Sequence, residues 1–117
     1  MVNSPQDLDR VFRALADSTR RGILAQLARD GQSSVGDLAE PHDMSSPAIS
    51  KHLRVLEEAG LIERKIDGRV HRLRLSSTPL DEAIQWIEKT RRFWESRFDS
   101  LERHLERNAK RKEKSRE

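Results

Sequence analysis

The segment Ser45–Gly60, with the sequence SSPAISKHLRVLEEAG, decides the fold. Ser45 or Ser46 can cap a helix, and Pro47 suits a first helical turn, where its missing amide hydrogen costs no hydrogen bond. The segment also holds an apolar stripe at helical spacing, made of Ile49, Leu53 and Leu56. Because Gly60 is a typical residue to end a helix, the segment predicts a capped amphipathic helix. Its first turns present small polar residues and a lysine.

Three further helices are predicted before this segment. The first covers about residues 7–16, where apolar residues recur at helical spacing: Leu8, Val11, Phe12 and Leu15. The second ends at Gly31, and the third covers Val35–Ala39 and closes at Pro41. This short third helix, a turn over residues 40–44 and the capped helix form the outline of a helix-turn-helix.

A β-hairpin is predicted directly after the capped helix. The segments Leu61–Ile66 and Arg69–Leu75 flank Asp67-Gly68, a dipeptide that favours a type I′ turn between two strands. In this wing, Leu73 and Leu75 are expected to face the core, with Arg72 and Arg74 pointing outward and Arg69 at the tip.

A long helix is predicted from Pro79 onward, with a heptad seam of apolar residues: Leu80, Ile84, Ile87, Trp94, Phe98, Leu101 and Leu105. The seam would extend about 39 Å at ~1.5 Å per residue, which is longer than so small a domain can cover by itself. We therefore expect part of the seam to meet another chain. The elements together predict a mainly α fold with a small β-hairpin (α+β). It is a winged helix-turn-helix in the order α-α-α-α-β-β-α, ending in a long dimerisation helix.

The composition and charge of the chain exclude several classes of function. The chain has 117 residues, of which 37% are charged and none is cysteine, so disulfides, thiolate metal sites and cysteine nucleophiles are excluded. No leader or membrane-spanning run is visible, which leads us to expect a cytoplasmic protein without membrane contact. Residues 61–117 hold sixteen Lys and Arg against eleven Asp and Glu, a basic half that suits a polyanionic partner. No nucleophile, phosphate loop or paired-carboxylate pattern points to an enzyme.

Four segments in consistent order resemble one protein family. They are Phe12–Leu24 (FRALADSTRRGIL), Val35–Ala39 (VGDLA), Ser45–Ile62 and Asp67-Gly68-Arg69. The chain resembles the ArsR/SmtB family of bacterial winged-helix repressors over about residues 8–106. The resemblance implies a homodimer paired through its first and last helices, a recognition helix near Ser46–Ala59, a wing near Leu61–Leu75 and a partly palindromic operator in double-stranded DNA.

Metal sensing, which is common in that family, has little support in this sequence. Ser34 stands where metal sensors of the family often have a ligand cysteine, and the last helix offers a single histidine, His104. The segment Phe93-Trp94-Glu95 looks more like the cysteine-free branch of the family. We therefore predict no metal and no cofactor, and the inducing signal is left open. A site built across a dimer from His104 with Glu102 or Glu106 remains an alternative.

The predicted DNA contacts fall into two groups. The recognition helix contributes Ser45, Ser46, Ala48, Ser50, Lys51, His52 and Arg54, with His52 either touching DNA or packing in the core. The wing contributes Arg64, Lys65, Arg69 and Arg72, with Arg69 placed to enter a minor groove.

The predicted assembly is a homodimer with the interface residues Leu8, Val11, Phe12, Ile87, Trp94, Phe98, Leu101 and Leu105. Residues 1–107 are expected to form the DNA-binding and dimerisation domain, and residues 108–117 a basic, flexible tail. The leading function is a dimeric repressor that binds an inverted repeat. The alternatives are a winged-helix module that binds a protein partner, and a metal-responsive repressor with a His/carboxylate site on the last helix.

Overall fold

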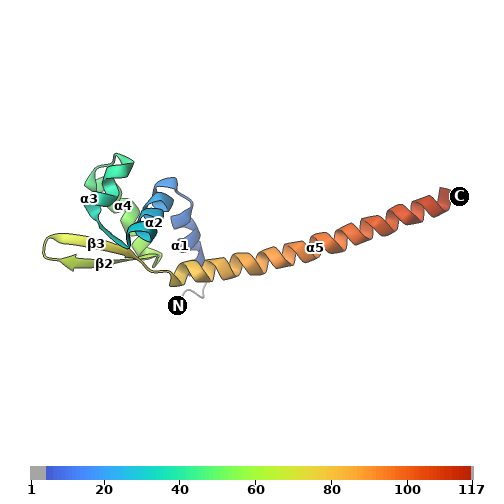
Figure 1. The fold of residues 1–117 in the computed structure, drawn as a ribbon. Helices are drawn as coiled ribbons and strands as arrows, with labels where there is room; N and C mark the ends of the chain where they lie inside the picture. The colour runs from blue at the N-terminus through green and yellow to red at the C-terminus, as the bar shows by residue number, and fades with distance from the viewer. Residues whose placement is uncertain (1–4, 117) are drawn as a thin grey trace. The chain divides into compact units, whose positions relative to one another are not determined.

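The structure is a computed structural model that describes residues 5–116, with side chains over residues 6–114. The elements in chain order are α1 (Pro5–Leu15), α2 (Ser18–Asp30), β1 (Gln32–Ser34), α3 (Val35–Ala39), the 3-10 helix η1 (Glu40–His42), α4 (Ser46–Glu58), β2 (Ile62–Asp67), β3 (Val70–Leu75) and α5 (Thr78–Arg116) (Figure 1). The chain divides into two compact units, Met1–Ala83 and Ile84–Glu117. The predicted mainly helical fold with a small hairpin and a long C-terminal helix is confirmed.

The first unit is built around one apolar core. The predicted stripe of α4, which consists of Ile49, Leu53 and Leu56, is completely buried there. Residues from all parts of the unit join it: Val11, Ala14, Ile23, Leu27, Leu38, Ala39, Ala59, Leu61, Ile62, Leu73 and Ala83. Leu73 brings the wing into this core, while Leu75 is only half-buried. The core thus holds α4 and the base of the hairpin within one compact unit.

The sheet has one strand more than the sequence predicts. The short strand β1 pairs antiparallel with β3, with Gln32 opposite Arg74 and Ser34 opposite Arg72, and gives the order β1-β3-β2. The predicted order α-α-α-α-β-β-α was therefore incomplete. Three polar residues are too few to show the alternation that marks a strand, and only Ser33 between them is buried.

The wing turn also differs from the prediction. Asp67 is the last residue of β2 and pairs with Val70, so the two-residue loop is Gly68-Arg69 rather than Asp67-Gly68. Gly68 has φ +64°, and Arg69 is not among the described residues with positive φ. Since a type I′ turn needs positive φ at both loop positions, the predicted type I′ turn is wrong, and the geometry is that of type II′. Arg69 still lies at the tip.

The helix ends follow from local hydrogen bonds. Ser45 is the N-cap of α4, and its side chain accepts a hydrogen bond from the amide of Ala48 at 3.3 Å. Asp17 caps α2 in the same way by accepting from the amide of Arg20 at 3.0 Å. The predicted third helix is confirmed as α3, which ends at Ala39, and Pro41 follows in the first turn of the 3-10 helix η1, where its missing amide hydrogen costs no hydrogen bond.

The second unit is the helical segment from Ile84 onward within α5. Its large apolar side chains are about half exposed: Ile84, Trp86, Ile87, Phe93, Trp94, Phe98, Leu101 and Leu105. Trp94 and Phe98 stack with ring centroids 5.8 Å apart. The helix continues to Arg116, through the segment assigned from sequence to a separate tail. Within residues 5–116, no helix is both long and apolar enough to span a membrane.

Candidate nucleic-acid interface

The N-cap Ser45 and the N-terminal two-thirds of α4 present exposed or partly exposed side chains outside the buried stripe. Ser45, Ser46, Lys51 and Arg54 are exposed, and Ala48, Ser50 and His52 are partly exposed. Ile49 and Leu53, which lie between these residues in the sequence, are completely buried in the core. The helix can therefore offer a row of hydroxyl, methyl and ammonium groups to a partner without disturbing the core.

His52 connects this helix to the start of α2. Its Nδ1 atom lies 3.2 Å from Nη1 of Arg20 and 3.8 Å from Oδ2 of Asp17, and its side chain is 21% exposed. The sequence leaves two environments open for His52, a DNA contact or the core; the side chain lies outside the apolar core, and the DNA contact stays a prediction. His52 packs against the polar N-terminus of α2, where it helps to set the position of the recognition helix.

Arg20 organises the same junction. Its guanidinium donates to the backbone carbonyls of Ala14 and Arg13, each at 2.9 Å, in the last turn of α1, where the Arg13 carbonyl also accepts from the Ala16 amide at 3.2 Å. The hydrogen bond from the Arg20 amide, together with the nearby charges of Arg20 and His52, lowers the pKa of the Asp17 carboxyl below its ordinary value. The junction thus ties α1, α2 and α4 together through one cation.

The basic residues of the wing differ in whether an acidic side chain pairs with them. Arg74 pairs with Glu63 at 2.9 Å, so its charge is balanced. Lys65, Arg69 and Arg72 are exposed and take part in none of the ion pairs among the described side chains. Lys65 lies directly opposite Arg72 across the strands. Like charges in that arrangement repel one another, so an anion bound there would relieve the repulsion.

Arg64 differs from its neighbours on the wing. Its Nη2 and Nε atoms donate to the two carboxylate oxygens of Glu57, at 2.5 and 3.3 Å, and its Nη1 lies 2.9 Å from Nδ1 of His71. The sequence prediction grouped Arg64 with the phosphate contacts, but in the structure its charge is already neutralised inside the protein. An open depression lined by Ser50, Arg54, Glu57, Glu58 and Arg64 lies beside this cluster.

The residues predicted to form the dimer interface differ in how exposed their side chains are. Val11 is completely buried in the core of the first unit, so its side chain is not available to a second chain. Leu8 and Phe12 on α1 are partly exposed. The α5 residues of the prediction are between 46% and 60% exposed: Ile87, Trp94, Phe98, Leu101 and Leu105.

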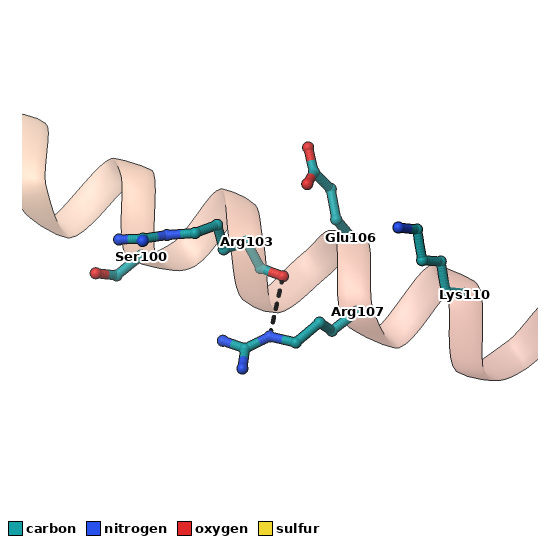
Figure 2. A pocket seen from close by; sticks show the side chains of 5 residues that line it. All are labelled: Ser100, Arg103, Glu106, Arg107 and Lys110. Carbon is teal, nitrogen blue, oxygen red and sulfur yellow. Dashed lines mark hydrogen bonds between the residues drawn. The ribbon is translucent and has the colours of Figure 1, made fainter.

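Polar residues of α5 line an open depression on the surface of this helix. Figure 2 shows an open depression lined by Ser100, Arg103, Glu106, Arg107 and Lys110, all from this one helix. Nε of Arg107 donates to the backbone carbonyl of Arg103 at 3.4 Å. His104 lies beside Asn108, with 3.3 Å between Nε2 and Nδ2. Among the described residues, no three His, Asp or Glu side chains gather closely enough to hold a metal ion.

Comparison with known proteins agrees with this arrangement. A helix-turn-helix domain family matches residues 15–65, from the end of α1 to the second half of β2. The transcriptional repressor SdpR of Bacillus subtilis is 38% identical over 80 residues, which cover 68% of this chain and 88% of SdpR. The arsenical resistance operon repressor of Escherichia coli is 35% identical over 98 residues, which cover 84% of each chain.

The chain belongs to the ArsR/SmtB family. Solved structures agree: a crystal structure of an ArsR family transcriptional regulator has 38% identity and a TM-score of 0.75, and covers 82% of this chain and 98% of that one. An ArsR-like regulator from Rhodococcus has 34% identity and a TM-score of 0.71, and covers 82% and 90%. Members of the ArsR/SmtB family are transcriptional regulators that bind DNA through the helix-turn-helix, not enzymes. This chain is accordingly a DNA-binding regulator of the winged helix-turn-helix type.

Sequence reasoning did not predict the contacts that connect α4 and the wing to the rest of this ArsR/SmtB fold. Arg20, Glu57 and His71 all contact groups on other elements. Glu57 and Arg64 lie on opposite sides of the turn at Gly60, and no periodicity links them. Only the opposite charges of the two side chains, seven residues apart, could have suggested the pair.

Proposed function

We propose that this ArsR/SmtB protein is a homodimeric repressor that binds an inverted-repeat operator, with α4 in the major groove and the wing in the adjacent minor groove. The observation that carries the proposal is the composition of the first unit's polar surface. One compact unit joins an exposed helix start rich in small polar residues to a hairpin whose Lys65, Arg69 and Arg72 take part in none of the ion pairs among the described side chains.

Reading of bases is assigned to the start of α4. Ser46, Ser50 and Lys51 are exposed or partly exposed, and a lysine can donate to the acceptor atoms of guanine in the major groove. Ala48 leaves room for a close approach or for contact with a thymine methyl group. Ser45 caps the helix, whose first amides favour a phosphate. Arg54 extends the same surface by one turn.

We assign to the wing the contacts that bind DNA of any sequence, mainly through its phosphates. Lys65 and Arg72 repel one another across the strands in the free protein, and a phosphate between them would remove that repulsion. Arg69 lies in the two-residue loop, the narrowest part of the hairpin, and is placed to enter a minor groove.

Pairing of two chains is assigned to the exposed apolar residues. Five α5 residues of the predicted interface are about half exposed: Ile87, Trp94, Phe98, Leu101 and Leu105. An apolar row of this length in water favours burial against another surface. A second copy of this chain offers the same row, and a twofold pair presents two reading helices to an inverted repeat. Leu8 and Phe12 are added from α1, whereas Val11 is left out because it is buried.

The test is selection of bound duplexes from a random pool, followed by binding measurements over a salt series. The proposal expects an enriched inverted repeat, bound at least about a thousandfold more tightly than random DNA. Lys51→Ala and Ser50→Ala should change the enriched bases. Arg69→Ala and Lys65→Ala should weaken binding to all duplexes and flatten the salt dependence. Equal losses on selected and random DNA from all four changes would contradict the assignment of α4 as the reader.

A further inference from the structure

The wing and the recognition helix are joined by a cluster of three side chains, Glu57, Arg64 and His71. Glu57 lies in the last turn of α4, Arg64 on β2 and His71 on β3. The guanidinium of Arg64 donates to both carboxylate oxygens of Glu57 and reaches Nδ1 of His71. One cation therefore connects three elements.

The register of the hairpin explains why these groups meet. Arg64 is opposite Leu73, which is completely buried, so both side chains lie on the face of the wing that turns toward the core. His71 is two residues away from Leu73 on β3 and shares that face. Toward the tip, residues 65–70 are all exposed. The cluster thus lies at the boundary between the buried base of the wing and its exposed tip.

The chemistry of the cluster does not fit a phosphate contact. The Arg64 side chain is only 24% exposed, and its Glu57 partner is 31% exposed. A phosphate would have to displace a carboxylate held through two hydrogen bonds and would meet the negative charge of Glu57 beside it. On the opposite face, Lys65 and Arg72 take part in none of the ion pairs among the described side chains, and the Glu63 carboxylate that lines the same depression is paired with Arg74.

We infer that Arg64 is a positioning residue, which holds the wing at a fixed place relative to α4 so that Arg69 and the start of α4 reach adjacent grooves together. The inference rests on the proposed DNA-binding function and specifies how its two contact elements are coupled. A wing that is already held in place loses less conformational freedom on binding, so the same contacts give a higher affinity.

The experiment is a double-mutant cycle with Glu57→Gln and Arg64→Gln, measured on the selected duplex and on random duplexes over a salt series. Each single change should weaken operator binding by about four- to twenty-five-fold, since a pair of this exposure contributes about two- to fivefold per protomer and a dimer carries two. The double variant should bind the operator about as tightly as the single variant with the lower affinity. Both single changes already remove the same Glu57–Arg64 interaction, so the second change has nothing further to remove. Thermal melting of each variant checks that the fold is retained.

The salt dependence of DNA binding shows whether Arg64 positions the wing or contacts phosphate directly. Arg64→Gln should leave the slope of log K against log salt unchanged, whereas the matched control Arg72→Gln should reduce the slope by about 1.8 for a dimer. A slope for Arg64→Gln that falls as far as that of Arg72→Gln would overturn the inference. Tighter operator binding by Glu57→Gln would also overturn it, because that result is expected of an arginine held back from phosphate.

Measurements without DNA keep this inference separate from the proposed function. Backbone order parameters of residues 65–70 should fall in Glu57→Gln and in Arg64→Gln, and stay unchanged in Arg72→Gln. Unchanged order parameters in both cluster variants would refute the coupling even if the protein bound no operator. If the wild type shows no preference for any selected duplex, the proposed function fails; if it shows one but the cycle is additive, only the coupling fails.

Discussion

Replacing Arg20 with alanine removes the cation that ties three helices together. The wild-type guanidinium makes two hydrogen bonds of 2.9 Å to the carbonyls of Arg13 and Ala14, and a third contact of 3.2 Å to His52. The change leaves the C-terminal carbonyls of α1 without this partner and removes one support of the recognition helix. We expect a loss of stability with no loss of any group that touches DNA in the proposed complex.

The magnitude follows from the surroundings of each bond. The bond to Ala14 is part-buried and that to Arg13 is exposed, so water can replace the second more easily. Hydrogen bonds from charged donors contribute about 1.5–3 kcal/mol when shielded, and exposed ones contribute less. The expected loss is about 2–3 kcal/mol. With a urea m-value of about 1.5 kcal/mol/M, the unfolding midpoint should fall by about 1.3–2 M.

Urea unfolding at one fixed protomer concentration measures this loss, because the stability of a dimer depends on concentration. Arg20→Lys should lie between wild type and Arg20→Ala, since an ammonium can donate to the carbonyls but cannot span them as the planar guanidinium does. Arg92→Ala removes an exposed arginine of α5 and serves as the matched control. A free energy of unfolding for Arg20→Ala within about 0.5 kcal/mol of that control would refute the reasoning.

Three further changes test the core, the cap and the pairing of chains. Leu53→Ala removes a completely buried side chain and should cost about 2–5 kcal/mol in thermal or urea unfolding, while Arg54→Ala next to it should leave stability nearly unchanged. Because the folded-state pKa of Asp17 is lowered from its ordinary value of 3.8, its ionised form stabilises the fold above that pH. The stability advantage of wild type over Asp17→Asn should shrink as the pH falls below 3.8 through the lowered folded value, and a constant difference would argue against the cap. Leu101→Asp should shift sedimentation toward a monomer and abolish operator binding, whereas Ser96→Asp adds the same charge at an exposed position outside the apolar row and should do neither.

Much of the fold could be predicted because its signals are local. The apolar stripe and serine cap of α4, the glycine between two alternating strands and the long heptad pattern each occupy one continuous stretch of sequence. Strand β1 was missed because its place depends on a partner more than thirty residues away, Arg74 on β3. The turn type depended on where pairing stops, and that is set by the register of the whole hairpin.

The candidate site was less predictable because residue type does not reveal a side chain's partners. Arg64 and Arg72 are both arginines on the wing, yet one is neutralised by Glu57 and the other is exposed without an ion-pair partner among the described side chains. Val11 lies in an apolar pattern that fits an interface as well as a core, and the structure places it in the core. His52 could not be assigned from sequence, because Arg20 and Asp17 approach it from another helix.

The central proposal is a homodimer that holds its two α4 helices at a fixed distance and orientation. Changing the spacing between the two half-sites on DNA tests it most directly. Binding is measured on the selected inverted repeat and on duplexes with five or ten base pairs inserted at its centre. Five base pairs turn one half-site to the opposite side of the duplex, so the account predicts that affinity falls to the level of a single half-site. Equal affinity for the original and the five-base-pair duplex would contradict it.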